Sequence, residues 1–373
     1  MANSERIPIL AINTEHGWRG GENQVFLLVR DLDPRFLPIV ACLPDSELGR
    51  RLAAIGIECI ALGMRGMRLP AAALRLRRLV RARGIRLVHA HTSLAHGLGL
   101  LVCAGGGPPL VVTRRVDFAV SRGVLSRWKY GSGVTRFVAI SHAIRNVLIR
   151  GGVVAEAIEV IRSGVDPQRI DSASAQDVRA EIGAPATATL VANVAALVAH
   201  KDHRTLLHAW QQVEREQPSA WLVIIGTGDL DAELAALGAH LGLARVAFLG
   251  WRDDVAGILK RADLFVISSR EEGLGTTIID ALLAGLPVVA TRAGGIPEVV
   301  GADCGVLVPV GDAPALAAEI SSLIGDPARR RALGATGRQR ALVDFTHRAM
   351  VDGYQRLYAD LIDHGVPEGT HVR

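Results

Sequence analysis

In the stretch SREEGLGTTIIDALLAG, residues 269–285, two carboxylates lie eight residues apart. Glu272 comes directly before a glycine-rich turn, whereas Asp280 falls inside an apolar segment that is predicted to be a helix from about Thr276 to Ala284. A buried carboxylate is costly unless hydrogen bonds satisfy it. Because helical side chains lean toward the N-terminus, we expect Asp280 to point back at the turn. Its partner there is either a ligand hydroxyl or, in the simpler interpretation, backbone amides or a water.

Glycines follow three predicted strands at points where a helix is expected to begin. Amides at a helix N-terminus favour phosphate, and glycine lets the backbone approach closely. Each turn alone is more simply interpreted as a tight turn, but three that converge on one cleft indicate a phosphate site. The GK[ST] element of an NTPase loop is missing, and the first turn lacks the full GxGxxG of a dehydrogenase. The glycines are Gly20 and Gly21, Gly226 and Gly228, and Gly273 and Gly275.

The elements that would position these residues alternate strand and helix along the whole chain. Nearly continuous apolar runs are typical of parallel strands covered on both faces. The alternation restarts after residues 165–188, which are rich in Ala, Ser, Asp and Pro and are the best candidate for an interdomain linker. The sequence therefore predicts an α/β fold with two Rossmann-like, doubly wound parallel-sheet domains facing across a cleft. We place these domains at residues 1–183 and 184–345, with a helix at 346–365 as a candidate to cross back to the first domain.

Composition indicates a globular protein of 373 residues with 49% hydrophobic and 21% charged residues. We predict neither a secretory signal nor a membrane span, because the apolar runs are too short. The four cysteines are far apart without a CxxC pair, which favours reduced thiols in a cytoplasmic protein. They are Cys42, Cys59, Cys103 and Cys304.

Positive charge is concentrated in the first half of the chain. Residues 1–180 carry 25 Lys and Arg against 14 Asp and Glu, whereas the remainder carries 17 against 23. Six of the arginines fall between Arg75 and Arg86, in a predicted basic amphipathic helix. That helix is either a solvated face or a dock for an anionic membrane surface, which would place the protein on the inner face of the cytoplasmic membrane. Nucleic acid is disfavoured, because only 4% of the residues are aromatic and no recognisable module appears.

Several motifs together carry a family resemblance. A glutamate and glycine, a second acid after seven residues, and the strand GLPVVAT followed by AGGIPEVV form the main pattern, with Glu272, Gly273 and Asp280 as its first members. Other matching stretches are GGENQ, FVAISHAI, VIRSGVDPQRI, HKDHRTLLHAW, IIGTGDL and FLGWRDDV. Over nearly its whole length the chain resembles the retaining group-1 glycosyltransferases of GT-B architecture. The resemblance implies sugar transfer from a nucleotide diphosphate sugar, with retention, no cofactor and no metal.

The resemblance also implies roles for individual residues. Asp280 would bind the ribose hydroxyls, Glu272 would face the donor sugar, and Lys201 would neutralise the leaving diphosphate. Amides of the 273–276 turn would hold the diphosphate, the first glycine loop would close on the phosphates, and the backbone at 251–252 would border the base. The donor-binding candidates are Gly20, Gly21, Gly226, Gly228, Trp251, Arg252, Gly273, Leu274, Gly275, Thr276 and Asp280.

Two departures from the family concern the donor side. The second acid is usually glutamate, so Asp280, one methylene shorter, needs a closer approach or a bridging water. The first basic residue of the family falls on Ala196, and Arg270 or Arg292 is a hypothetical substitute.

A third departure places Arg115, beside Arg114, where the family often has a histidine. We count Arg115 among the catalytic candidates, because two arginines suit an anionic donor or acceptor. The alternative is a salt bridge to Asp117 or another acid.

Four histidines lie near the predicted site. His89 and His91 share one face of a strand, and we favour their lining the cleft over their binding a metal. His200 and His203 flank Lys201 and are expected to shape its loop.

We therefore predict a retaining, hexosyl-type glycosyltransferase that uses a UDP-sugar before a GDP-sugar and needs no metal. Its acceptor is predicted to be lipid-linked or an envelope glycan. The alternatives are a GT-B nucleotide-sugar epimerase or hydrolase, and a noncatalytic sugar-nucleotide-binding protein or partner subunit.

Overall fold

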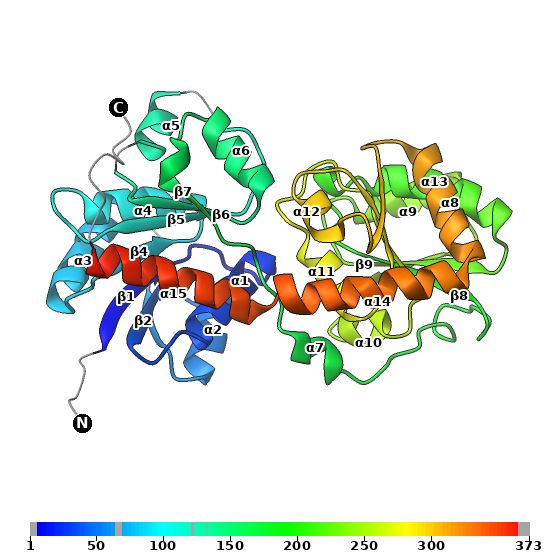
Figure 1. Cartoon of the computed structure of the whole chain (residues 1–373), viewed down its shortest axis with the longest axis horizontal. Coiled ribbons are helices and arrows are strands. Elements are labelled where there is room, and N and C mark those ends of the chain that lie inside the picture. Colours follow the sequence, from blue (N-terminus) through cyan, green and yellow to red (C-terminus); the bar gives the residue numbers. More distant parts are fainter. Residues whose placement is uncertain (1–5, 64–68, 121–122, 132, 365–373) are drawn as a thin grey trace. The chain divides into compact units, whose positions relative to one another are not determined.

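The computed structural model describes residues 6–63, 69–120, 123–131 and 133–364. The chain divides into two compact units (Figure 1): unit 1 comprises Met1–Gly164 and His347–Arg373, and unit 2 comprises Val165–Thr346. This boundary lies earlier than the predicted one at residue 183.

The segment 165–188 belongs to unit 2 because its side chains bind there. Arg179 is 8% exposed, and its guanidinium donates to Asp263 Oδ2 at 2.9 Å and to the carbonyl of Arg261 at 3.2 Å. This segment therefore has a composition typical of a linker, but it is a well-anchored part of the second domain.

The described part of unit 1 contains a seven-stranded parallel sheet in the order β3-β2-β1-β4-β5-β6-β7. Its strands are β1 (Ile7–Ile12), β2 (Phe36–Cys42), β3 (Glu58–Ala61), β4 (Leu87–Ala90), β5 (Leu110–Arg114), β6 (Arg136–Ala139) and β7 (Ile158–Val160). Its helices are α1 (Gly20–Arg30), α2 (Glu47–Ala54), α3 (Leu69–Ala82), α4 (Ser93–Cys103), α5 (Val124–Lys129), α6 (His142–Arg150), the short η1 (Ala155–Ala157) and α15 (His347–Asp363).

Helix α15, at the red end of the chain in Figure 1, packs on unit 1 although it follows all of unit 2 in sequence. Its apolar face, including Met350, Val351 and Leu357, joins one core with Ile9 and Leu87 of the sheet. The helix therefore completes the hydrophobic core of unit 1.

The described part of unit 2 contains a six-stranded parallel sheet in the order β10-β9-β8-β11-β12-β13. Its strands are β8 (Thr189–Val194), β9 (Ala220–Ile225), β10 (Val246–Gly250), β11 (Leu264–Ile267), β12 (Val288–Thr291) and β13 (Gly305–Val308). Its helices are α7 (Pro167–Asp171), η2 (Ala199–Lys201), α8 (His203–Glu216), α9 (Asp231–His240), α10 (Val255–Leu259), α11 (Thr276–Leu283), α12 (Ile296–Val300), α13 (Ala313–Gly325) and α14 (Pro327–Asp344).

The two units confirm the predicted class of two Rossmann-like, doubly wound parallel sheets. In each sheet the strand order reverses once, between β1 and β4 in unit 1 and between β8 and β11 in unit 2. Ligands of such sheets bind at the carboxyl ends of the strands near this reversal. The loops after these four strands are therefore the places to examine for a site.

The basic helix ends earlier than predicted. Helix α3 stops at Ala82, and Gly84 then takes a φ of 59°, a left-handed conformation that ends a helix. Arg83 and Arg86 therefore lie beyond the helix, in the connection to β4.

Two further sequence features have counterparts in the structure. All four cysteines are free thiols, of which Cys42 and Cys304 are buried. Across the residues described, none of the helices combines the length and apolar character needed to cross a bilayer.

Candidate functional site

Lys201 and Glu272 form an ion pair at the carboxyl ends of β8 and β11. Lys201 Nζ contacts Glu272 Oε2, and the two side chains are 18% and 13% exposed. Lys201 ends the short helix η2, and Glu272 lies in the loop that leads from β11 to α11. Two residues predicted separately are therefore partners in one largely buried pair.

The loop after β11 also holds the turn that carries Lys201. The backbone N–H of Arg270 donates to the carbonyl of His200 at 2.8 Å, and Ser268 Oγ donates to the carbonyls of Lys201 and Asp202 at 3.1 and 2.9 Å. Asp202 has a φ of 49° and caps α8. These contacts fix the backbone of Lys201.

Arg270 lies at the rim of this turn. Its Nε donates to Asp202 Oδ2 at 2.7 Å, and its side chain is 60% exposed whereas that of Asp202 is 4% exposed. Arg292, the other proposed substitute for the cation missing at Ala196, is also exposed. Arg270 is thus bound beside Lys201, but its charge is already partly neutralised by an acid.

Asp280 binds an arginine that the sequence prediction did not name. It is 8% exposed on α11, and its Oδ1 forms an ion pair with Nη2 of Arg169 from α7. Burial raises the pKa of the Asp280 carboxyl, and the neighbouring Arg169 offsets part of that rise. The partners considered from the sequence were a ligand hydroxyl, backbone amides and a water, so Arg169 is a correction. The sequence signal for Arg169 was the VDPQRI motif, which was assigned to the predicted interdomain linker.

The glycine turn before α11 has the geometry of a helix N-terminus. Gly275 is the N-cap with a φ of 90°, and Thr276 is the first helical residue. Leu274 is 1% exposed, so the turn is anchored on its apolar side. A β-carbon on Gly295 would collide with the carbonyl of Gly273, so the AGGIPE segment lies directly against the turn. The first N–H groups of α11 have no intrahelical partner and are available to an anion.

Gly226 and Gly228 have a packing role that explains them without a ligand. A β-carbon at these positions would collide with the carbonyls of Ala195 and Leu197, respectively. The N–H of Leu197 also donates to the carbonyl of Thr227 at 3.1 Å. The loop after β9 therefore lies against the segment after β8, and donor binding by these glycines stays a prediction.

Trp251 and Arg252 follow β10 and differ sharply in their surroundings. Trp251 is 66% exposed. The Arg252 guanidinium donates twice to Asp254, at 2.8 Å each, and to Glu181 at 2.7 Å. These carboxylates raise the pKa of Arg252. The charge of Arg252 is therefore satisfied within the protein. The indole of Trp251 remains exposed next to this anchored residue.

In unit 1, the first glycine turn and Arg115 lie together. Gly20 begins α1, and a β-carbon on Gly21 would be 3.8 Å from Cδ of Arg115. Arg115 Nη1 is 3.4 Å from both Nδ1 and the carbonyl of His91. Burial lowers the pKa of Arg115 below its usual value. The structure thus brings together three predicted residues at the carboxyl ends of β1 and β5.

Arg114 forms hydrogen bonds with different residues from those that contact Arg115. It donates to Tyr130 Oη at 2.5 Å and to the carbonyl of Phe118. For the described residues, the contacts of Arg114 and Arg115 do not include the alternative salt bridge to Asp117.

His89 does not line a cleft, so that prediction is wrong. It is 1% exposed, and its ring nitrogens hydrogen-bond Tyr358 Oη at 2.6 Å and Thr113 Oγ1 at 2.7 Å. The His91 ring packs on it at 3.8 Å between centroids, and burial lowers the pKa of both well below the usual range. The side-chain period of two correctly placed both histidines on one face of the strand. It did not predict that helix α15 covers this face.

The other two histidines behave as expected. His203 Nε2 hydrogen-bonds Asn193 Oδ1 at 3.0 Å, and burial lowers its pKa to about 4. The carbonyl of His200 accepts from the loop after β11. In the described ranges, no three His, Cys, Asp or Glu side chains are grouped to hold a metal.

Comparison with known proteins shows that each unit matches the model of a glycosyltransferase family. Residues 174–340 match the model of group 1 glycosyl transferases, and residues 18–169 match that of glycosyltransferase family 4. The fold and these matches agree, so the chain belongs to the group-1 glycosyltransferases of GT-B architecture.

Two curated relatives and one solved structure illustrate the similarity. The lipopolysaccharide core biosynthesis glycosyltransferase LpsE of Rhizobium meliloti is 33% identical over 184 residues, 48% of this chain and 53% of that protein. The GDP-mannose-dependent monoacylated alpha-(1-6)-phosphatidylinositol monomannoside mannosyltransferase of Corynebacterium glutamicum is 32% identical over 204 residues, 52% and 53% of the two chains. The Anabaena protein Alr3699/HepE, solved with UDP and glucose, has a TM-score of 0.83 at 23% identity and covers 95% and 100% of the two chains. The chain spans about half the length of the curated relatives it matches, 53% for the first two.

Proposed function

We propose that this protein transfers a hexosyl group from a nucleotide diphosphate sugar to an acceptor, with retention of the anomeric configuration and without a metal. The Lys201–Glu272 pair beside the N-terminus of α11 carries this proposal. The pair supplies a cation for a departing diphosphate and a carboxylate for the sugar side, and the first turn of α11 adds backbone amides.

The leaving group explains why such a site suits the reaction. A nucleoside diphosphate gains negative charge as its bond to the sugar breaks, and preorganised cations and amides stabilise that charge without reorganising. A cation about 4 Å away contributes roughly 4 kcal/mol at an effective dielectric constant near 20. Lys201 is held by its loop for this task, and diphosphate must compete with Glu272 for its ammonium group.

Asp280 is proposed to bind the ribose hydroxyls with Arg169 still in place. An ionised carboxylate has about four lone-pair sites, so it can accept from a guanidinium and from hydroxyls together. Arg169 contacts Oδ1, and 11% of the Asp280 side chain remains exposed. In this view Arg169 orients the shorter acid and keeps it ionised.

UDP is the favoured nucleotide, and GDP is the next candidate. The Anabaena neighbour binds UDP, which supports the first candidate, whereas the Corynebacterium relative is GDP-mannose-dependent, which supports the second. Exposed Trp251 beside the fixed Arg252 is the proposed border of the base.

A lipid-linked or envelope-glycan acceptor is proposed for unit 1, on the cytoplasmic face of the membrane. The names of the two curated relatives, which refer to lipopolysaccharide core and to a phosphatidylinositol mannoside, support this acceptor class. The arginines of α3, of which Arg75, Arg78 and Arg81 are exposed, support contact with an anionic membrane surface.

A noncatalytic sugar-nucleotide binder is the second candidate, favoured by Ala196 at the place of a basic residue. One experiment separates the two. A thermal-shift screen against nucleotide sugars identifies the donor, because a ligand at 100 times its Kd stabilises the fold by about 2.7 kcal/mol.

The identified donor is then incubated with and without a panel of lipid and glycan acceptors. Acceptor-dependent release of the nucleoside diphosphate, with an unchanged anomeric configuration by NMR, supports the transferase. Tight donor binding without turnover supports the binder, and brisk acceptor-free turnover supports an epimerase or hydrolase.

A further inference from the structure

A pocket of about 420 Å³ lies at the edge of the unit 1 sheet opposite to Arg115 and His91. Gly84–Arg86 come directly before β4, and Pro108 and Pro109 come directly before β5, so the pocket is at the amino ends of these strands. The lining residues that matter here are Arg77, Arg81, Arg86, Val102 and the loop Gly105–Gly107.

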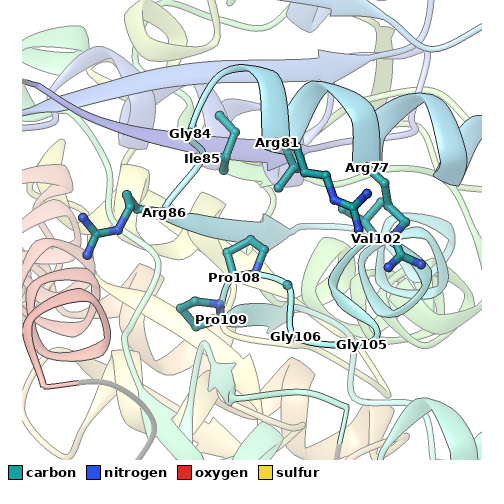
Figure 2. A pocket seen from close by; sticks show the side chains of 12 residues that line it. Arg77, Arg81, Gly84, Ile85, Arg86, Val102, Gly105, Gly106, Pro108 and Pro109 are labelled. Carbon is teal, nitrogen blue, oxygen red and sulfur yellow. The ribbon is translucent and has the colours of Figure 1, made fainter.

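Three of the lining side chains are cationic and none is acidic. Figure 2 shows Arg77 and Arg81 together beside Val102, with Arg86 beyond Ile85 and Pro108. Arg77 and Arg81 are four residues apart on α3, a spacing at which like charges repel. An anion between the two guanidinium groups would relieve this repulsion.

Arginines near a helix C-terminus have a simpler explanation, which is compensation of the helix dipole. Both α3 and α4 end near the pocket, and each C-terminus has a partial charge of about −0.5. Arg77 meets part of this demand, because its Nη2 donates to the carbonyl of Ala104 at 2.9 Å. Three unit charges exceed the combined partial charge of the two helices, however, so a net positive potential remains.

The loop that closes the pocket adds backbone donors. Gly105 and Gly106 have φ angles of 72° and 83°, and a β-carbon on Gly105 would be 3.7 Å from Nη2 of Arg77. Within the described residues, the N–H groups of Gly105 and Gly106 have no backbone acceptor, whereas that of Gly107 donates to the carbonyl of Cys103 at 3.0 Å. Two N–H groups without a backbone acceptor therefore lie in the loop that approaches the Arg77 guanidinium.

We propose that this pocket is an anion site that binds a phosphate group, carried either by a soluble phosphate ester or by a lipid headgroup. Arg77 and Arg81 bind the phosphate oxygens through charge-assisted hydrogen bonds, the Gly105–Gly106 amides add neutral donors, and Arg86 contributes charge from the margin. The site is separate from the donor site of unit 2, and it does not depend on the proposed transfer reaction.

The test uses two variants of the full chain that differ only in where one charge is removed. Arg81→Gln removes a charge from the pocket, and Arg78→Gln removes one from the same helix outside it. Both side chains are exposed, and neither has a hydrogen bond or ion pair with the described residues. In calorimetric titration with inorganic phosphate, we expect Arg81→Gln to weaken binding about tenfold and Arg78→Gln to leave it nearly unchanged. Equal weakening of phosphate binding in both variants, or unchanged binding in Arg81→Gln, would overturn the proposal that this pocket binds phosphate.

Vesicle flotation then distinguishes the two sources of phosphate. Vesicles of phosphatidylcholine with and without phosphatidylglycerol are mixed with the same variants. A clearly larger loss of lipid-dependent flotation in Arg81→Gln than in Arg78→Gln, which removes the same charge from the surface of α3, assigns the pocket to a lipid headgroup. If Arg81→Gln loses phosphate binding but floats as the wild type does, the ligand is a soluble phosphate ester.

Discussion

In unit 2, four charged pairs of the candidate site each join groups of opposite sign, whereas the pocket of unit 1 holds arginines with no acid among them. The unit 2 pairs are Lys201–Glu272, Arg169–Asp280, Arg270–Asp202 and Arg252–Asp254. The unit 1 pocket combines Arg77, Arg81 and Arg86.

The difference shows two ways to prepare a protein for an anion. Paired charges hold each other in a fixed geometry, so a ligand must replace one partner, and binding becomes selective. Unpaired cations attract anions over a longer range, but salt screens them beyond about 10 Å at 0.1 M ionic strength. The first arrangement suits a reaction centre, and the second suits an anchoring site.

The largest expected effect is on catalysis by the central pair. Glu272→Gln should reduce transfer by about 1000-fold, because the charge proposed to face the sugar is lost. Binding of the nucleoside diphosphate should be retained or become tighter, since Lys201 no longer has a competing carboxylate. Initial rates and calorimetric affinities measure both effects, and Glu271→Gln is the matched control. Wild-type activity of Glu272→Gln at normal donor affinity would refute the role assigned to this residue.

The second prediction tests whether Lys201 and Glu272 act as a pair. Lys201→Met should lower the transfer rate by about 100-fold and the free energy of unfolding by about 2 kcal/mol, because Glu272 is left buried without its cation. The double variant Lys201→Met/Glu272→Gln should recover most of that stability without recovering activity. Urea unfolding of the two single variants and the double variant gives the coupling energy. Strictly additive losses of stability would mean that the pair is not coupled.

The third prediction concerns Arg169 and pH. Arg169→Met should destabilise unit 2 by about 2 kcal/mol at neutral pH, less than for a fully buried pair, because Arg169 is half-exposed. Burial then acts alone on Asp280, and its folded-state pKa, already raised, rises further. A raised carboxyl pKa stabilises the fold at low pH, and this contribution is lost as pH rises through the folded-state pKa.

The stability deficit of Arg169→Met should therefore shrink from about pH 8 to about pH 5, as measured by urea unfolding. Arg261→Met is the control, because its partner Asp177 is more exposed and has a pKa of about 2. A deficit that does not depend on pH would show that Asp280 does not carry it.

The smallest effects should have opposite signs in the two regions. Arg270→Gln removes a partner of buried Asp202 and should cost about 1 kcal/mol. Arg81→Gln relieves repulsion from Arg77 and should stabilise unit 1 by about 0.3 kcal/mol in phosphate-free buffer. Thermal unfolding of both variants measures the contrast. A loss of stability in Arg81→Gln would mean that Arg81 has a stabilising structural role of its own.

The sequence predicted local features of unit 2 well and contacts between distant residues poorly. The start of α11 at Thr276 follows from the glycine turn and the apolar run, and both are local signals. Lys201 and Glu272 were each recognised from a motif, but their contact joins positions 71 residues apart, which no periodicity encodes. Arg169 was missed for the same reason.

In unit 1, a helix that is distant in sequence buries a strand face that the sequence pattern predicted to line a cleft. The period of two placed His89 and His91 on one face of the predicted strand, but Tyr354 and Tyr358 of α15 cover that face. Tyr358 is 269 residues from His89 in sequence, and of the two histidines only His89 hydrogen-bonds it. The residue composition of 165–188 likewise predicted a linker, although Arg179 ties that segment to Asp263.

The contact of α15 with unit 1 also has a consequence for biosynthesis. Tyr354 and Tyr358 hydrogen-bond Thr113 and His89, yet the ribosome makes them only after every residue of unit 2. A nascent chain that has reached Thr346 has the whole of unit 2 but leaves the polar groups of β4 and β5 uncovered. Although domains commonly fold in order of synthesis, here the second unit can complete its core before the first.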